Sequence, residues 1–193
     1  MEKLIGLKKI RTAVFISGNG SNLKNLIKFS KTKKNPISIN LVVSNTKKAK
    51  GLKYANEYNI KKKVINFQNI RNAEKQILIF LKKEKISLIC LAGFMKILSK
   101  NFIKKFKGKI LNIHPSLLPK FKGLNTHERA IKGKEKYSGC TVHFVNSKLD
   151  SGKIILQERV RINKYDTPRN LAKKVLAKEH KLYPKAILKI FSL

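Results

Sequence analysis

The feature that most constrains the fold is an alternation of short apolar runs with longer amphipathic segments along the first 114 residues. Several runs are apolar on both faces, which is typical of strands in a buried parallel sheet. The segments between them place apolar residues at helical spacing, with lysine on the outer side. The predicted strands are residues 12–17, 37–43, 62–66, 87–92 and 109–114, and the predicted helices are 21–31, 47–57 and 70–84. This alternation predicts an α/β fold with a doubly wound, mostly parallel sheet.

The pattern changes in the second part of the chain. Residues 138–146 and 153–162 alternate apolar and polar side chains, which predicts a mixed or antiparallel extension of the sheet. Asp150, Ser151 and Gly152 form the predicted turn between these strands. Residues 167–190 predict a long closing helix, with Thr167 as its cap and Pro184 as the place of a bend.

The 193 residues contain no repeat and no flexible linker, so we expect one domain over residues 1–193. We assign phosphate binding to about residues 1–107 and catalysis to about residues 108–193. No secretion signal and no run of about 18 apolar residues is present, so we expect a cytoplasmic protein. Cys90 and Cys140 lie in apolar stretches and are interpreted as buried hydrophobic side chains, and we expect no metal.

The net charge of +35 would suit a nucleic-acid-binding protein. The lysines are spread over every segment, however, and only six arginines are present. Because this pattern fits a drift in coding composition, we expect no specific nucleic acid partner. A basic nucleic-acid-binding module remains an alternative hypothesis, although aromatic residues are not interleaved with the basic ones.

A glycine-rich turn, Gly18-Asn19-Gly20-Ser21-Asn22, follows the first predicted strand and leads into a helix. Glycines allow close approach of the backbone to a ligand, and the free N–H groups of a helix start favour an anion. The third glycine of a dinucleotide-binding motif is missing, so the pattern predicts a single phosphate. Alternatively, the turn is structural and Ser21 or Asn22 caps the helix.

Asn112 and His114 lie two residues apart at the end of a predicted strand, so their side chains share one face. An amide and a protonated imidazole can together donate hydrogen bonds to an oxygen on which negative charge develops, as in acyl transfer to an amine. A hydrogen-bonded structural pair is the alternative. Thr141 and His143 also share one strand face and are candidates for supporting the pair, with a purely structural histidine as the alternative at position 143.

A nearby carboxylate would hold the imidazole and stabilise its charged form, and Asp150 is the candidate, although an aspartate in a turn is often structural. Serine and cysteine occur in no nucleophile motif, which favours direct transfer between two bound substrates.

Five motifs in this order are similar to the phosphoribosylglycinamide formyltransferase family. They are GNGSNL at 18–23, LAGFMKILS at 91–99, LNIHPSLLPKFKGLNTHERAI at 111–131, TVHFVNSKLDSGKIILQ at 141–157 and EHKLYP at 179–184. The resemblance covers nearly the whole chain and implies a Rossmann-like formyltransferase fold. It also implies transfer of the formyl group of 10-formyltetrahydrofolate to glycinamide ribonucleotide in purine biosynthesis, by a monomer or a homodimer.

The resemblance implies specific site residues. The family's catalytic asparagine, histidine and aspartate match Asn112, His114 and Asp150. Its folate site matches Arg71, Met95, Lys96, Ile97, Leu98, Asn112 and the loop of Asn146, Ser147, Lys148, Leu149 and Asp150. Its ribonucleotide site matches Gly20, Ser21 and Asn22 at the phosphate and Glu179 near the amine. Lys96 and Leu176 replace an arginine and a polar residue that are frequent in the family.

Another formyl-folate enzyme on the same scaffold is the main alternative. A methionyl-tRNA formyltransferase would fit the positive charge, and a formyl-folate hydrolase would use water in place of the amine. The absence of a second domain and the sequences GNGSNL and GLNTHERA favour the glycinamide enzyme.

Overall fold

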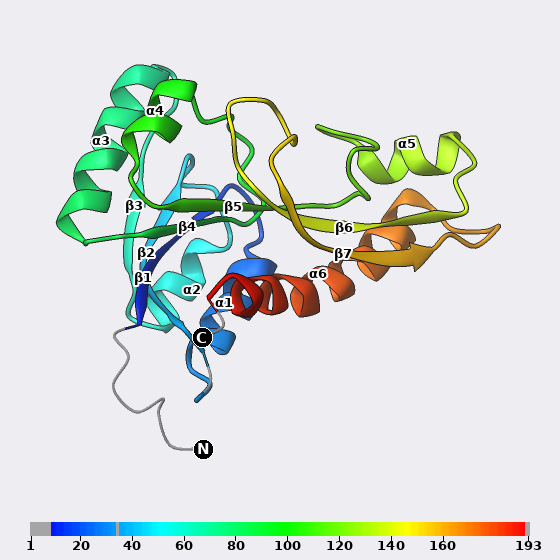
Figure 1. Cartoon of the computed structure of the whole chain (residues 1–193), viewed down its shortest axis with the longest axis horizontal. Helices are drawn as coiled ribbons and strands as arrows, with labels where there is room; N and C mark the ends of the chain where they lie inside the picture. The colour runs from blue at the N-terminus through cyan, green and yellow to red at the C-terminus, as the bar shows by residue number, and fades with distance from the viewer. Residues whose placement is uncertain (1–8, 34, 192–193) are drawn as a thin grey trace.

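The computed structural model of the chain describes residues 9–33 and 35–191, which form seven strands and six helices (Figure 1). The elements are β1 (Ile10–Ile16), α1 (Ser21–Ser30), β2 (Ile37–Ser44), α2 (Leu52–Glu57), β3 (Lys61–Val64), α3 (Ile70–Lys83), β4 (Leu88–Leu91), α4 (Lys100–Lys105), β5 (Lys109–His114), α5 (Thr126–Lys132), β6 (Tyr137–Phe144), β7 (Ile154–Arg161) and α6 (Pro168–Phe191). Residues 1–8, which contribute to the expectation about secretion signals, lie outside the described residues.

The strands form one sheet in the order β3-β2-β1-β4-β5-β6-β7. Strands β1 to β5 pair in parallel, whereas β6 pairs antiparallel with β5 and β7 antiparallel with β6. The order runs outward from β1 in both directions, as a doubly wound sheet requires. The predicted fold class, including the antiparallel extension and the closing helix, is confirmed.

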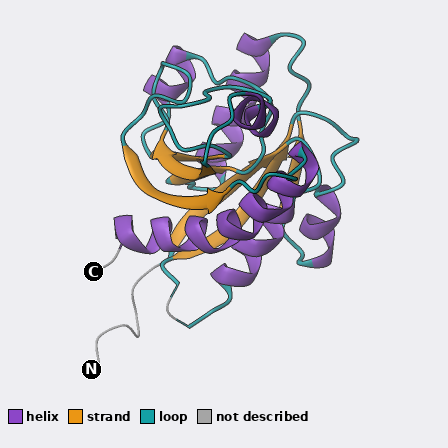
Figure 2. Cartoon of the chain, turned by 90° about the vertical axis from the view of Figure 1, so that its right-hand side faces the viewer, coloured by secondary structure: helices purple, strands orange, loops and turns teal. Residues whose placement is uncertain are grey.

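Helices cover both faces of the sheet, so its central strands are buried on both sides (Figure 2). On one face, Val14, Cys90 and Leu111 pack with residues of α1 and α6. On the other face, Phe15 and Ile89 pack with residues of α3 and α4. These two layers explain why β4 is apolar at every position and β1 is apolar from Ala13 to Ile16.

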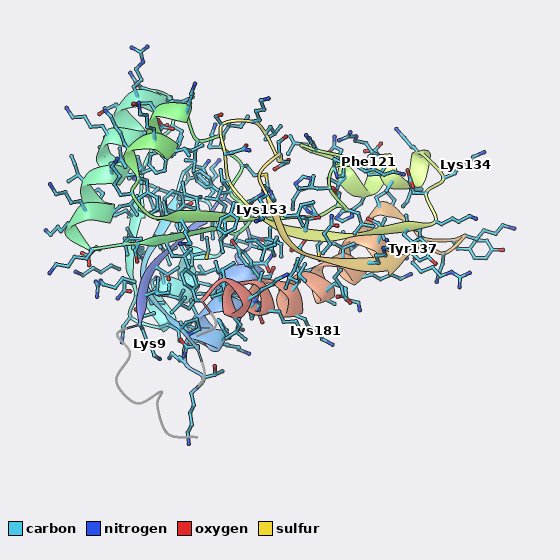
Figure 3. The ribbon with its side chains drawn as sticks, in the orientation of Figure 1. Lys9, Phe121, Lys134, Tyr137, Lys153 and Lys181 are labelled. Carbon is cyan, nitrogen blue, oxygen red and sulfur yellow. The ribbon has the colours of Figure 1, made fainter. Side chains whose placement is uncertain are left out.

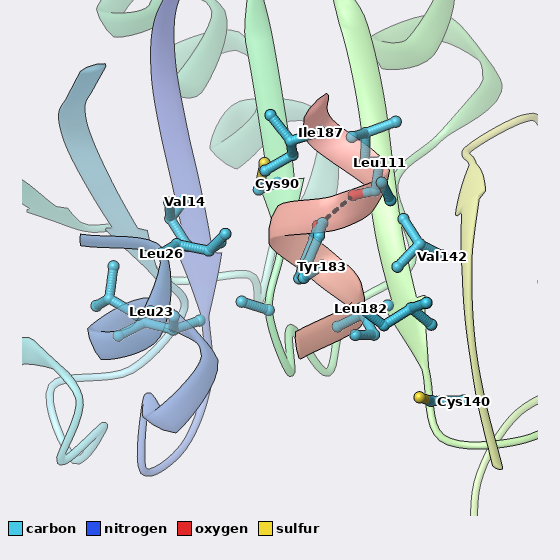
Figure 4. Close-up of a cluster of buried hydrophobic side chains, with 14 of the residues drawn as sticks. Val14, Leu23, Leu26, Cys90, Leu111, Cys140, Val142, Leu182, Tyr183 and Ile187 are labelled. Carbon is cyan, nitrogen blue, oxygen red and sulfur yellow. Dashed lines mark hydrogen bonds between the residues drawn. The ribbon is translucent and has the colours of Figure 1, made fainter. Parts of the chain in front are cut away.

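The long closing helix α6 begins as predicted, because the Asn170 N–H donates to Thr167 Oγ1 at 3.2 Å. The helix continues through Pro184 to Phe191, so the predicted bend does not interrupt it. Its buried residues include Tyr183, whose hydroxyl lies 3.1 Å from the Leu91 carbonyl oxygen and 3.2 Å from that of Leu111. Figure 4 shows the contact with Leu111. The helix is therefore fixed to the last residue of β4 and to β5 by a polar contact inside the core.

Some local details differ from the predictions. Strand β3 covers Lys61–Val64 instead of residues 62–66, and it is exposed along its length because it is an edge strand, with lysines that protect the edge. Helix α2 begins at Leu52 and not at residue 47, since the backbone of Gly51 packs against the glycine turn and its N–H donates to the Gly18 carbonyl. The short helices α4 and α5 were not predicted.

Both cysteines are buried, as predicted, and burial raises the pKa of each thiol to about 12. Thiols with such pKa values are poor nucleophiles. Within residues 9–33 and 35–191, no cluster of three or more His, Cys, Asp and Glu side chains could hold a metal ion.

The positive charge is distributed over the molecule, as the positions of Lys9, Lys134, Lys153 and Lys181 illustrate (Figure 3). None of the helices in the described part of the chain is long and apolar enough to cross a membrane.

Candidate active site

A cavity of about 680 Å³ lies where β4 and β5 end. Its walls come from the segments after β4 and β5, the connection between β6 and β7, and one side of α6. Of the predicted site and supporting residues, those lining the cavity are Asn22, Met95, Lys96, Ile97, Leu98, Asn112, His114, His143, Asn146, Ser147, Lys148, Leu149, Asp150 and Glu179. Ligands of doubly wound proteins bind at this edge of the sheet.

Asn112 and His114 project from the last residues of β5 into the cavity. In the antiparallel pairing with β6, Asn112 stands opposite His143 and His114 stands opposite Thr141. Opposed residues of two paired strands share one face of the sheet, so four polar residues gather there.

Each ring nitrogen of His114 faces an oxygen. Nδ1 lies 3.4 Å from Oδ2 of Asp150, and Nε2 lies 2.9 Å from the carbonyl oxygen of Phe121. The side chains of His114 and Asp150 are 6% and 8% exposed, so the pair is screened from bulk water. Only the doubly protonated imidazolium can donate to both oxygens at once.

The Asp150 carboxylate connects several parts of the site. Its backbone is left-handed, with a φ of 44°, which aspartate tolerates better than most residues. Oδ2 accepts the N–H of Gly123 at 2.9 Å, and Oδ1 lies 3.5 Å from Nδ2 of Asn112, at the limit of a hydrogen bond. The aspartate in the predicted turn therefore contacts both Asn112 and His114.

His143 orients Asn112. Burial lowers the pKa of His143, although the Phe144 carbonyl and Asp150 oppose this effect, so the ring is neutral near pH 7. Nδ1 lies 2.8 Å from the Phe144 carbonyl oxygen and must carry the proton, which leaves Nε2 to accept from Asn112 Nδ2 at 3.2 Å. One amide hydrogen of Asn112 is thereby fixed and the other is directed toward Asp150 and the cavity.

Thr141 supports the segment after β5 and does not line the cavity. Its hydroxyl donates to the Ser116 carbonyl at 2.6 Å and accepts the Leu118 N–H at 3.1 Å. Gln157 also donates to this oxygen, at 2.9 Å. Thr141 therefore lies behind the site, and its supporting role stays a prediction.

The start of α1 forms a second polar region. Gly20 has a φ of 71°, and a Cβ at this position would lie 2.6 Å from the Cα of Gly51, so glycine is required. No side chain of the described residues caps α1, so the alternative in which Ser21 or Asn22 caps the helix is not observed. The first N–H groups of the helix remain available to an anion.

Asn22 joins the start of α1 to α6. Its Nδ2 donates to Oε2 of Glu179 at 2.6 Å, and both residues line the cavity. Asn22 is only 7% exposed, yet its Oδ1 has no hydrogen-bond partner among the described residues. Burial raises the pKa of Glu179 to about 7, and the hydrogen bond from Asn22 partly opposes this rise.

The segment after β4 and the connection between β6 and β7 together give the cavity an apolar mouth. Met95, Ile97 and Leu149 are 62%, 69% and 51% exposed, whereas Leu98 is buried. The Met95 N–H donates to the Ser17 hydroxyl at 2.8 Å, which fixes this segment to the end of β1. Large apolar side chains that stay exposed around a cavity are typical of ligand sites.

Some predicted residues lie elsewhere, and some lining residues were not predicted. Arg71 is exposed in the first turn of α3, and neither it nor Gly20 nor Ser21 lines the cavity. Gly123 and His127 line it although no role was assigned to them. Both lie within the stretch 111–131 that carries the family resemblance, but neither has a local pattern that indicates a function.

A comparison with protein families matches residues 10–187 to the family described as formyl transferase. The chain belongs to the formyl transferase family. Its seven-stranded sheet with the closing helix is shared with solved members. The crystal structure of phosphoribosylglycinamide formyltransferase from Brucella melitensis superposes with a TM-score of 0.89 at 43% identity, covering 96% of each chain.

Curated relatives of this formyl transferase include both long and short proteins. The trifunctional purine biosynthetic protein adenosine-3 of Homo sapiens is 45% identical over 183 residues, which are 93% of this chain but 18% of that protein. The phosphoribosylglycinamide formyltransferase of Haemophilus influenzae is 42% identical over 184 residues, covering 94% of this chain and 86% of the relative. The chain thus spans less than a fifth of the trifunctional relatives and most of the bacterial ones.

Proposed function

We propose that this formyl transferase moves the formyl group of 10-formyltetrahydrofolate to the amine of glycinamide ribonucleotide, a step of purine biosynthesis. The main observation in support of this proposal is that Asn112, His114 and Asp150 meet in a cavity that is also lined by Asn22 and Glu179. One cavity thus holds donors for a developing negative charge and a carboxyl group for an amine. The names of the relatives support the same reaction.

In the proposed reaction the amine nitrogen bonds to the formyl carbon and the bond from that carbon to the folate nitrogen breaks. The amine loses a proton and the folate nitrogen gains one. Negative charge develops on the formyl oxygen, where Asn112 Nδ2 and His114 Nε2 are the donors. Because Nε2 faces the Phe121 carbonyl, its hydrogen must change partner from that carbonyl to the substrate oxygen. Asp150 holds the imidazolium during the exchange.

The ribonucleotide phosphate is assigned to the start of α1, with Gly20, Ser21 and Asn22. Glu179 then faces the amine. With a pKa of about 7 this carboxyl can hold an ammonium group when ionised and can also accept a proton from it. The unpartnered Oδ1 of Asn22 is an acceptor for a substrate N–H or O–H group.

The formyl donor is assigned to the apolar mouth. Met95, Ile97, Leu98 and Leu149 offer surface to a flat ring system, and Lys96 and Lys148 offer positive charge to its carboxylates. A planar aromatic ligand with acidic groups at one end fits such a lining. The role assigned to Arg71 stays a prediction, because this residue lies outside the cavity lining.

The test is a formyl transfer assay with 10-formyltetrahydrofolate and three acceptors: glycinamide ribonucleotide, charged initiator tRNA and water. We expect turnover with the ribonucleotide and at least about a hundredfold less with the other acceptors. Turnover with the tRNA alone would identify a methionyl-tRNA formyltransferase. Equal release of formate with and without acceptor would identify a hydrolase.

The cytoplasmic location, the absence of a specific nucleic acid partner and the choice between monomer and homodimer stay predictions. The division at about residue 107 also stays a prediction. Sedimentation of the purified chain at two protein concentrations measures its oligomeric state.

A further inference from the structure

The loop between Phe121 and Asn125 has an uncommon backbone and contacts the two central site residues. Phe121, Gly123 and Asn125 are all left-handed, with φ values of 55°, 77° and 56°. A bulky residue such as phenylalanine rarely adopts this conformation. The loop supplies the carbonyl that faces His114 Nε2 and the Gly123 N–H that binds Asp150. Its conformation therefore determines the hydrogen bonds of both residues.

One side chain outside the cavity holds this loop. Arg129, on α5, donates from Nη1 to the Lys122 carbonyl at 2.6 Å and to the Leu124 carbonyl at 3.3 Å. These carbonyls flank Gly123. The guanidinium also lies 5.3 Å from the ring of Phe121, which packs beside α5 (Figure 3). Arg129 thus contacts the loop on both sides of the peptide N–H that binds Asp150 and at the residue whose carbonyl faces His114.

We infer that Arg129 is a positioning residue for His114 and Asp150 in the formyl transfer proposed above, on which this assignment rests. Arg129 contacts neither residue directly. It holds the loop in the conformation in which the Phe121 carbonyl faces the His114 imidazole and the Gly123 N–H donates to the Asp150 carboxylate. Without it, the left-handed backbone at Phe121 relaxes and both hydrogen bonds weaken.

The residue type agrees with this role. The sequence has six arginines among 45 basic residues, so lysine is the default cation of this chain. A planar guanidinium can donate to two carbonyls and still lie against an aromatic ring, whereas an ammonium group is a single point charge on a flexible stem. Arg129 is exposed, so its removal leaves no buried cavity and the fold should persist.

The first measurement is steady-state kinetics of Arg129→Ala and Arg129→Lys against the wild type, each with circular dichroism to verify folding. We expect kcat to fall about tenfold in Arg129→Ala and at least fivefold in Arg129→Lys. The pH profile of kcat should also change, because the hydrogen bonds of His114 change. Arg169→Ala, which truncates an exposed arginine in the first turn of α6, is the control and should keep wild-type kcat.

The second measurement does not need activity. The chain has four histidines, so ring N–H signals in ¹⁵N-labelled protein can be assigned by substituting each one. In the wild type without substrates, His114 Nε2–H should give a protected signal because it donates to Phe121. Arg129→Ala and Arg129→Lys should broaden or shift this signal and leave that of His143 in place.

The two measurements separate the possible failures. If the wild type does not turn over glycinamide ribonucleotide, the proposed function fails and the His114 signal alone decides the positioning role. Folded Arg129 variants that keep the wild-type His114 signal overturn the inference, whatever their activity. A changed signal with unchanged kcat and pH profile also overturns it, because the loop geometry then has no effect on the reaction.

Discussion

The two ends of the cavity differ in how completely their polar atoms are paired. At the β5 end, Asn112, His114 and Asp150 already have partners in the protein, including backbone groups of the loop after β5. At the α1 end, Asn22 Oδ1 has no partner among the described residues and the buried carboxyl of Glu179 accepts one hydrogen bond. The first end is organised without a ligand, whereas the second has an unpaired acceptor and a buried carboxyl that a ligand could pair with.

This difference separates two tasks. Donors that stabilise developing charge work best when their positions are fixed beforehand, since the side chains then need not move and only the His114 hydrogen bond changes partner. A buried polar atom without a partner is unfavourable by about 1–3 kcal/mol, and a ligand that supplies the partner regains that free energy on binding. We therefore expect changes at the β5 end to lower kcat and changes at the α1 end to raise KM.

The largest expected effect is at the β5 end. Asp150→Asn should lower kcat about a hundredfold or more with KM changed less than threefold, and His114→Ala should do the same. Steady-state kinetics with thermal unfolding as a check measures this. Asp166→Asn is the matched control, because that carboxylate binds Lys174 outside the cavity. Near-normal kcat in both site variants would remove the pair from the mechanism.

The second effect concerns Glu179 and stability. Its pKa rises from 4.5 unfolded to about 7 folded, so the folded state binds the proton more tightly and stability falls as pH rises through that window. Glu179→Gln removes this dependence. The gain in unfolding free energy of the variant over the wild type should be roughly 2 kcal/mol larger at pH 8 than at pH 5. Denaturant unfolding at both pH values measures the change. Parallel pH dependences of wild type and variant would contradict it.

Glu179→Gln also tests the comparison between the β5 end and the α1 end of the cavity. Glu179→Gln should be less active while being more stable at pH 8, because the carboxyl that we propose to hold the amine is the group that is unfavourable to bury. We expect kcat/KM for the ribonucleotide to fall about tenfold. An active variant with the higher stability would mean that Glu179 does not face the amine.

The third effect is on substrate binding at the α1 end. Asn22→Ala should raise KM for the ribonucleotide about tenfold and change kcat less than threefold, because it removes a group completed by the substrate. Asn25→Ala is a close control, since Asn25 also donates from α1 to α6, at the His180 carbonyl, but does not line the cavity. A large fall in kcat for Asn22→Ala would show that the α1 end does more than bind the substrate, which contradicts the division between the two ends of the cavity.

The smallest effect is expected at the exposed mouth. Lys96→Ala should raise KM for the folate donor only about twofold to threefold, because an exposed charge interacts weakly through water. Lys104→Ala, on the exposed side of α4, should have no effect. A tenfold rise in KM for Lys96→Ala would mean that Lys96 is buried against the folate donor in the complex.

Much of the arrangement of residues at the two ends of the cavity could be predicted from the sequence, because it depends on strand periodicity and on the glycine turn. Asn112 and His114 share a face because they are two residues apart, and the glycine turn precedes α1 because Gly20 needs a left-handed backbone. The expected helix at 47–57 was too long because Gly51 is constrained by a contact with Gly20, which is distant in the sequence. Local patterns carry no information about such a contact.

The parts that were missed depend on backbone groups. The Phe121 carbonyl and the Gly123 N–H act at the site, but every residue has these groups and no side-chain pattern identifies them. Arg129 was one charge among many in the sequence. Its geometry becomes visible only once the loop is folded beside α5.

The hydroxyl of Tyr183 has a consequence for how the protein is made. It contacts carbonyls of Leu91 and Leu111, and Glu179 lies one helical turn before it on the same helix. The cavity wall formed by α6 therefore cannot assemble until these residues have emerged from the ribosome. Until then, His114 and Asp150 have no Glu179 across the cavity, so the complete site forms only when synthesis of this helix is nearly finished.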